Sequence, residues 1–249
     1  MSSPFNAILR RGLLAGAFAG LTAALLSLLL VQAPLQASLG IEEARSHASG
    51  EHAHEEMFSR PVQVVGGMVA AVLVGVAIGV IFAVVFASVR HRTTARTDFG
   101  RSLQLTAVGF FAVSLLPALK YPANPPGVGE TESVSGRTLA YFSFIAAGIL
   151  IVLAAHHLHG YLRARGWNPS RSTTATAAAT AVLAGVALWA WPANPDPIPA
   201  DVPAALLWQF RLASLAELAG MWAVLGFSFG LLNESSRSAA ATEALATQR

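Results

Sequence analysis

Hydrophobic residues along the chain gather into six long stretches, which shorter polar segments separate. The stretches cover residues 12–33, 62–89, 103–120, 138–160, 174–191 and 206–232. A helix needs about 20 mostly apolar residues to cross the hydrocarbon core of a bilayer, and each stretch meets or nearly meets that length. None of them alternates apolar and polar residues, as the strands of a membrane barrel do. The pattern predicts an all-α bundle of six transmembrane helices arranged as three hairpins.

Composition narrows the class of protein. Of the 249 residues, 54% are hydrophobic and only 12% are charged, whereas about 25% of the residues in an average soluble domain are charged. These figures exclude an ordinary soluble enzyme, a nucleic-acid-binding domain and a disordered protein. The chain has no cysteine, which excludes disulfides and thiolate metal sites. It also lacks the phosphate-binding loop, the zinc-protease motif and the nucleophile elbow, so we expect that it is not an enzyme.

Charged residues divide unequally between the two sides of the expected bundle. One side carries eleven of the sixteen basic residues with three of the thirteen acids, and the other carries five basic residues with nine acids. The positive-inside rule makes the basic side cytoplasmic. Both termini are then cytoplasmic, and segments 34–61, 121–137 and 192–205 lie outside. We expect an integral membrane domain over 1–233 and a disordered tail over 234–249, which is rich in Ser, Ala and Thr.

Two outer segments share a motif. The sequence Pro-Ala-Asn-Pro follows an aromatic residue at 122–125 and again at 192–195, and an acidic loop and an arginine come after each copy. The second and third hairpins therefore look like parallel copies, an arrangement common in transporters. Two interpretations of Asn124 and Asn194 remain. They support a rigid helix stop, since proline ends a helix, or they offer side-chain oxygens to a passing cation.

The most specific polar cluster lies in the first outer segment, where three histidines and three glutamates fall within ten residues. Imidazole and carboxylate groups together bind several divalent transition metals. One interpretation is a site that captures a metal, and the other is a solvated polar loop without an ordered site. The candidate ligands are His47, Glu51, His52, His54, Glu55 and Glu56.

Three residues inside or near the spans are also candidates. Glu217 is the only acid in the middle of a stretch, and the cost of a charge in the bilayer predicts that it faces the protein interior. One interpretation is that Glu217 relays protons or binds a cation. The other is that it is a structural residue, either protonated or paired with Arg137 or Arg211. His156 and His159 share a helix face at the cytoplasmic end of the fourth stretch. They form an inner metal site or an interfacial polar patch.

Small residues recur within the stretches, often at four-residue spacing. Such spacing lets helix backbones approach closely, so we interpret these glycines as helix-packing positions. They are Gly12, Gly16, Gly20, Gly66, Gly67, Gly75 and Gly79.

Taken together, these features resemble the CbtA family of predicted cobalt transporter subunits over about residues 5–235. The most specific resemblance is Tyr-Pro-Ala-Asn-Pro-Pro-Gly at 121–127, joined by Trp-Pro-Ala-Asn-Pro at 191–195 and Phe-Arg-Leu-Ala-Ser at 210–214. It implies a multi-pass protein of the bacterial cytoplasmic (inner) membrane, linked to cobalamin and cobalt, with a small single-span CbtB subunit as partner. The family is described with about five spans, whereas the charge division and the repeat favour six.

The resulting hypothesis is a subunit of a divalent-metal uptake transporter, with cobalt as the substrate and the outer His/Glu segment as the capture site. A homo-oligomer is compatible with it. The alternative is a non-transporting membrane protein that senses metal or serves as an assembly scaffold. Nothing in the sequence selects cobalt over nickel or zinc.

Overall fold

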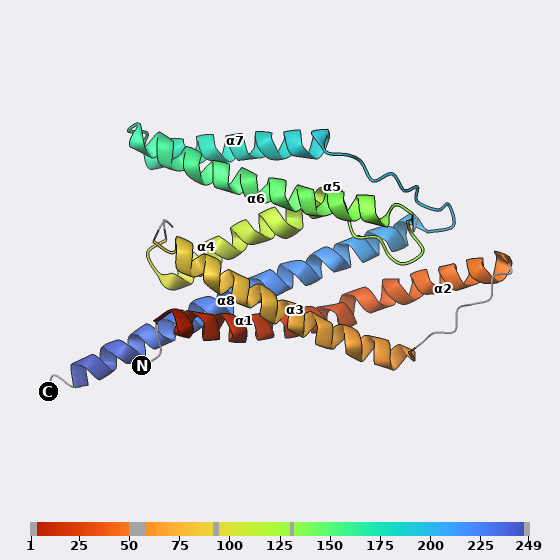
Figure 1. Ribbon diagram of the computed structural model, residues 1–249, viewed down its shortest axis with the longest axis horizontal. Helices are drawn as coiled ribbons and strands as arrows, with labels where there is room; N and C mark the ends of the chain where they lie inside the picture. Colours follow the sequence, from red (N-terminus) through yellow and green to blue (C-terminus); the bar gives the residue numbers. More distant parts are fainter. Residues whose placement is uncertain (1–3, 50–57, 92–94, 130–131, 247–249) are drawn as a thin grey trace.

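The computed structural model describes residues 4–49, 58–91, 95–129 and 132–246, and within these ranges the chain is helical without strands (Figure 1). Two of the helical segments, η1 and η2, are single π-helical turns. The elements are α1 (Pro4–Leu26), η1 (Ser27–Val31), α2 (Gln32–Ser49), α3 (Arg60–Val89), α4 (Asp98–Phe110), η2 (Phe111–Leu115), α5 (Leu116–Lys120), α6 (Val134–Ala164), α7 (Pro169–Ala190) and α8 (Ala204–Ala246).

Six helical units in the described residues are long and apolar enough to cross a membrane, which confirms the six predicted spans. The first unit runs through α1, η1 and α2, and the third runs through α4, η2 and α5. An even number of crossings returns the chain to its starting side, and the two termini do lie at the same end of the molecule (Figure 1). We call the opposite end, which holds both Pro-Ala-Asn-Pro loops, the outer end.

Two helices extend beyond the predicted stretches. The first continues from its apolar part to Ser49, and α8 continues to Ala246, where the sequence predicted a disordered tail from 234. Both extensions are rich in alanine and other strong helix formers, and no glycine or proline interrupts the second one. At about 1.5 Å per residue, the 43 residues of α8 span about 65 Å, roughly twice the thickness of the hydrocarbon core.

Each π-helical turn lies just before a proline. The backbone N–H of Gln32 bonds to the carbonyl of Ser27 two residues before Pro34, and the N–H of Leu116 bonds to the carbonyl of Phe111 directly before Pro117. Proline lacks an N–H group and its ring collides with the carbonyl four residues earlier. The wider π turn accommodates it, so that both long helices continue past their prolines.

The helices form two packed groups. In the first group α1 packs against α3 and α8, and α4 packs against α8. The centre of this group is an aromatic cluster, in which the Phe229 ring lies 5.1 Å from the Phe82 ring and 4.9 Å from the Phe86 ring. In the second group α6 and α7 pack against each other, and α6 also packs against η2 and α5 (Figure 1). Phe144 is its buried centre, 5.6 Å from the Trp191 ring. The third span therefore joins the two groups, because its α4 half contacts α8 and its η2–α5 half contacts α6.

Glycines set the close approach of α1 and α3. A Cβ atom added to Gly16 would lie 2.5 Å from the carbonyl oxygen of Gly75, and one added to Gly75 would lie 2.5 Å from the Cα atom of Gly20. These contacts agree with the packing interpretation. Gly66 and Gly67 differ, because a Cβ atom there would meet nothing within 4 Å. The reason is that α3 diverges from the first helix towards the outer end (Figure 1).

Candidate functional site

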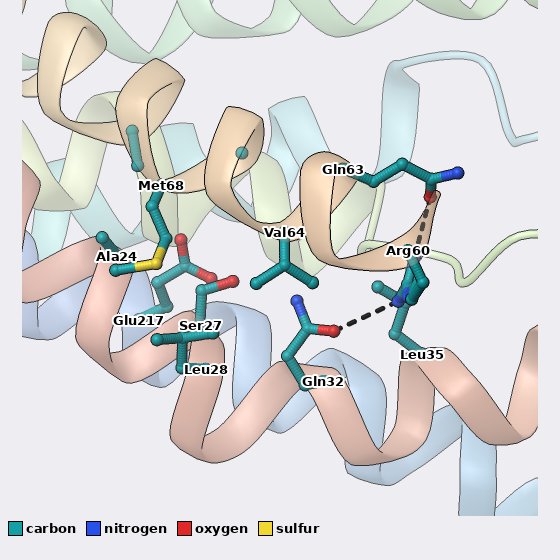
Figure 2. A pocket seen from close by; sticks show the side chains of 12 residues that line it. Ala24, Ser27, Leu28, Gln32, Leu35, Arg60, Gln63, Val64, Met68 and Glu217 are labelled. Carbon is teal, nitrogen blue, oxygen red and sulfur yellow. Dashed lines mark hydrogen bonds between the residues drawn. The ribbon is translucent and has the colours of Figure 1, made fainter. Parts of the chain in front are cut away.

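A cavity of about 360 Å³ opens where α3 diverges from the first helix, and its wall includes one residue of α8 (Figure 2). Its lining carries a carboxylate, a guanidinium, two amides, a hydroxyl and a thioether among apolar side chains. The residues that supply these groups are Ser27, Gln32, Arg60, Gln63, Met68 and Glu217.

The π turn η1 shapes one wall of the cavity. Ser27 begins this turn and Gln32 follows its end, and both side chains line the cavity. Single π turns inside long helices often occur at functional sites. On the opposite wall Gly67 lacks a side chain, which leaves room between the helices.

Arg60 lines the cavity and links α3 to α2. Its Nη2 atom donates to the Oε1 atom of Gln32 at 3.1 Å, and its Nη1 atom donates to the Oε1 atom of Gln63 at 3.1 Å. The amide nitrogen of Gln63 in turn donates to the carbonyl of Phe58 at 3.0 Å. Two neutral amides thus hold the guanidinium, and it forms no ion pair with an acid among the described residues.

Glu217 lines the cavity from the middle of the membrane-spanning part of α8, which agrees with the prediction that it faces the protein interior. Figure 2 shows its carboxyl group between the hydroxyl of Ser27 and the thioether of Met68. Within the part of the chain that the structure describes, Glu217 forms no ion pair. The arginines considered as its partners bind elsewhere: Arg137 pairs with Asp196, and Arg211 donates to Asn124. The arginine-paired alternative for Glu217 is therefore wrong.

The two motif asparagines lie at the outer end and do not line the cavity. The Oδ1 atom of Asn124 accepts a hydrogen bond from the Nη2 atom of Arg211 at 2.9 Å. The Oδ1 atom of Asn194 accepts one from the backbone N–H of Asp196 at 3.3 Å. The helices before the two motifs end at Lys120 and Ala190, each within two residues of a motif proline, as expected for a helix stop.

Contacts between the two repeated hairpins are reciprocal. Arg211 of the third hairpin bonds to Asn124 of the second, and Arg137 of the second hairpin pairs at 2.7 Å with Asp196 of the third. The side chain of Asp196 is only 3% exposed and that of Arg137 is 29% exposed, so the second contact is a partly buried ion pair. The two hairpins that share the sequence repeat therefore contact each other at the outer end, and each hairpin supplies an arginine to the other.

The first hairpin joins this network through α2. Arg45 binds both carboxylate oxygens of Asp201 at 2.8 Å from its Nη2 atom and donates from Nη1 to the carbonyl of Gly127 at 3.1 Å. The hydrogen bonds from Arg45 lower the pKa of Asp201 below its ordinary value. The Ser38 hydroxyl also donates to the carbonyl of Pro126 at 2.6 Å. All three hairpins are thus linked at the outer end.

The histidine candidates lie at opposite ends. His47 is exposed near the end of α2, while Glu51, His52, His54, Glu55 and Glu56 lie outside the described residues. His156 is exposed and His159 is half-buried on α6. Among the described residues, no group of three or more His, Asp or Glu side chains is arranged to hold a metal ion.

Sequence reasoning did not identify the residues that surround Glu217. Gln32, Arg60 and Gln63 are polar residues at the facing ends of the first two hydrophobic stretches. Because a hairpin brings those two ends together, the positions of these residues could have predicted a polar cluster between the first two spans. Met68 gave no such signal, since it lies inside an apolar run.

Six helical units able to cross a membrane, three of which line a polar cavity that holds one acid, define a multi-pass membrane protein. Acids inside membrane spans often belong to ion or proton pathways. The family model described as "probable cobalt transporter subunit (CbtA)" matches residues 5–234, nearly the whole chain. The chain therefore belongs to the CbtA family, as its motifs indicated. No curated protein and no solved structure matches it.

Proposed function

We propose that this chain is the membrane-spanning subunit of a cobalt uptake system of the bacterial inner membrane, and that the ion crosses the bilayer past Glu217. The observation that carries this proposal is the environment of Glu217, an acid that lies within a transmembrane helix, faces a polar cavity and forms no ion pair in the described structure. A carboxylate in that position is expensive in a bilayer and is typical of an ion path. The CbtA family supplies the cobalt assignment.

The outer segment after α2 is our candidate for the capture site, with His47, Glu51, His52, His54, Glu55 and Glu56 as ligands. Helix α2 carries His47 fifteen residues beyond Gln32, which lines the cavity. At about 1.5 Å per residue this separation is about 22 Å along the helix. Such a distance is too long for one ion to contact both sites, so captured metal must be released before it enters the cavity.

Three further parts of the path are proposed from their positions. Asn124 and Asn194 lie at the outer end, from which we propose that the ion enters, and a carbonyl oxygen with one hydrogen bond retains a second lone pair for a cation. His156 and His159, near the opposite end of α6, are candidates for release of the ion. A small single-span, histidine-bearing subunit of the CbtB type is the expected partner, and the exposed apolar surface of the spans also allows a homo-oligomer.

Accumulation of labelled cobalt in cells that express the chain with its partner tests the proposal. Glu217→Gln should abolish accumulation, because it removes the charged group in the membrane. Glu234→Gln on the same helix should retain accumulation and serves as the matched control. Replacement of His47, His52 and His54 by Ala should raise the cobalt concentration needed for half-maximal uptake.

Wild-type accumulation by Glu217→Gln would contradict the role of the cavity, and wild-type affinity in the triple histidine variant would contradict capture. Purified protein that binds cobalt but produces no flux into liposomes would instead favour a sensor or an assembly scaffold.

A further inference from the structure

We propose that the cavity is a mixed oxygen–sulfur cation site, in which the Met68 thioether selects transition-metal ions over Mg²⁺ and Ca²⁺. This inference rests on the proposed function and adds to it the residue that sets specificity. Its direct observation is the convergence of a carboxylate, a hydroxyl and a thioether from three separate helical segments on one cavity.

The position of Met68 is not explained by packing alone. Met68 also lines a neighbouring hollow whose other walls are Leu21, Ala24, Val69, Val72 and Leu73. Leucine would fill that apolar environment equally well, and Leu–Met exchanges usually cost little. Figure 2 shows the sulfur of Met68 on the side that faces Glu217. The property that distinguishes methionine from leucine here is therefore a sulfur donor beside a carboxylate.

The electrostatics of the cavity leave Glu217 available for a cation. The polar lining contains one acid and one base, and they are not paired with each other. Gln32 and Gln63 hold the guanidinium of Arg60 through two 3.1 Å hydrogen bonds at the outer end. Because these amides fix the guanidinium away from Glu217, an entering cation does not have to displace it.

The donor set determines which cations benefit. Mg²⁺ and Ca²⁺ are hard ions that take oxygen ligands, and Mg²⁺ gives up its waters reluctantly. A thioether is a soft ligand, so it adds binding energy for a transition metal and none for these two ions. The volume of about 360 Å³ greatly exceeds the roughly 30 Å³ of one water molecule. An ion can thus keep part of its hydration shell, as passage through a transport site requires.

Uptake of cobalt into proteoliposomes containing the full chain and its partner, with Mg²⁺ as competitor, tests the selectivity. Met68→Leu should weaken the apparent cobalt affinity about tenfold and leave inhibition by Mg²⁺ unchanged, so that the ratio of the two constants falls about tenfold. Met221→Leu is the matched control, because Met221 is buried in the core one turn after Glu217 and does not line the cavity. It should keep the wild-type ratio. An unchanged ratio in Met68→Leu would overturn the inference.

X-ray absorption of the cobalt-loaded protein provides a second readout that does not depend on transport. The chain has no cysteine and only four methionines, so a sulfur atom in the cobalt shell must come from methionine. We expect a sulfur contribution in wild type that disappears in Met68→Leu and persists in Met221→Leu. Its absence from wild type would also overturn the inference.

The two proposals fail in different ways. No cobalt uptake by the wild-type protein would overturn the proposed function itself. Cobalt uptake that depends on Glu217, with the same selectivity in Met68→Leu as in wild type, would leave the proposed function intact and remove only the role of Met68.

Discussion

Replacement of Gly75 by alanine is the sharpest test of the packing in the first helix group. The added Cβ atom would lie 2.5 Å from the Cα atom of Gly20 and 2.6 Å from the carbonyl oxygen of Gly16, whereas ordinary contacts are 3.4–4 Å. Both neighbours are backbone atoms, so no side-chain rotation relieves the collision. The two helices must separate by about 1 Å, and forced overpacking of this kind costs about 1–3 kcal/mol.

Alanine also stabilises a helix interior by about 0.5–1 kcal/mol relative to glycine. A control variant must remove this contribution from the comparison. Gly66→Ala provides that control on the same helix, because its Cβ atom would meet nothing within 4 Å. Gly66→Ala should be neutral or stabilising. The difference between the two variants is therefore the packing cost, for which we take about 2 kcal/mol as the centre of the range.

Thermal unfolding in detergent micelles, followed by tryptophan fluorescence, measures this difference. For a chain of this size about 2 kcal/mol corresponds to a midpoint about 4–8 °C lower for Gly75→Ala than for Gly66→Ala. Equal midpoints for the two variants would show that α1 and α3 do not approach as closely as the structure places them.

Two further predictions concern hydrogen bonds outside the cavity. The indole N–H of Trp222 donates to the hydroxyl of Ser114 at 2.9 Å in a buried position. Trp222→Phe should therefore lower the free energy of unfolding by about 1 kcal/mol or more. The control is Trp189→Phe, at a side chain that is 85% exposed, and it should leave the unfolding midpoint unchanged. Arg45 lowers the pKa of Asp201, so this pair stabilises the fold above about pH 4 and its contribution is lost as the pH falls through the lowered pKa. Asp201→Asn should remove that part of the acid dependence of the unfolding midpoint between about pH 5 and pH 3, and an unchanged acid dependence would show that the pair contributes nothing.

The number and helical type of the membrane spans followed from the sequence because they depend on local properties. A run of about 20 apolar residues has few alternatives to a membrane-spanning helix, so all six spans and the all-helical fold were predictable. The duplicated Pro-Ala-Asn-Pro motif also fixed where two of the helices end, since proline prevents the helix from continuing. The extension of the first helix past Pro34 was missed because the π turn that accommodates this proline leaves no simple signal in the sequence.

The surroundings of Glu217 required the tertiary structure. The sequence alone predicted that this acid faces the interior, because the energetic cost of a charge in lipid does not depend on which helices are its neighbours. Hydrophobic pattern does not specify how each helix is rotated or where two helices diverge. Those features bring Ser27 and Met68 beside Glu217, and they direct Arg211 to Asn124 instead of to the acid. The sequence thus determined that the chain crosses the membrane six times with one acid inside, and the packing of α3 and α8 against the first helix decided what that acid faces.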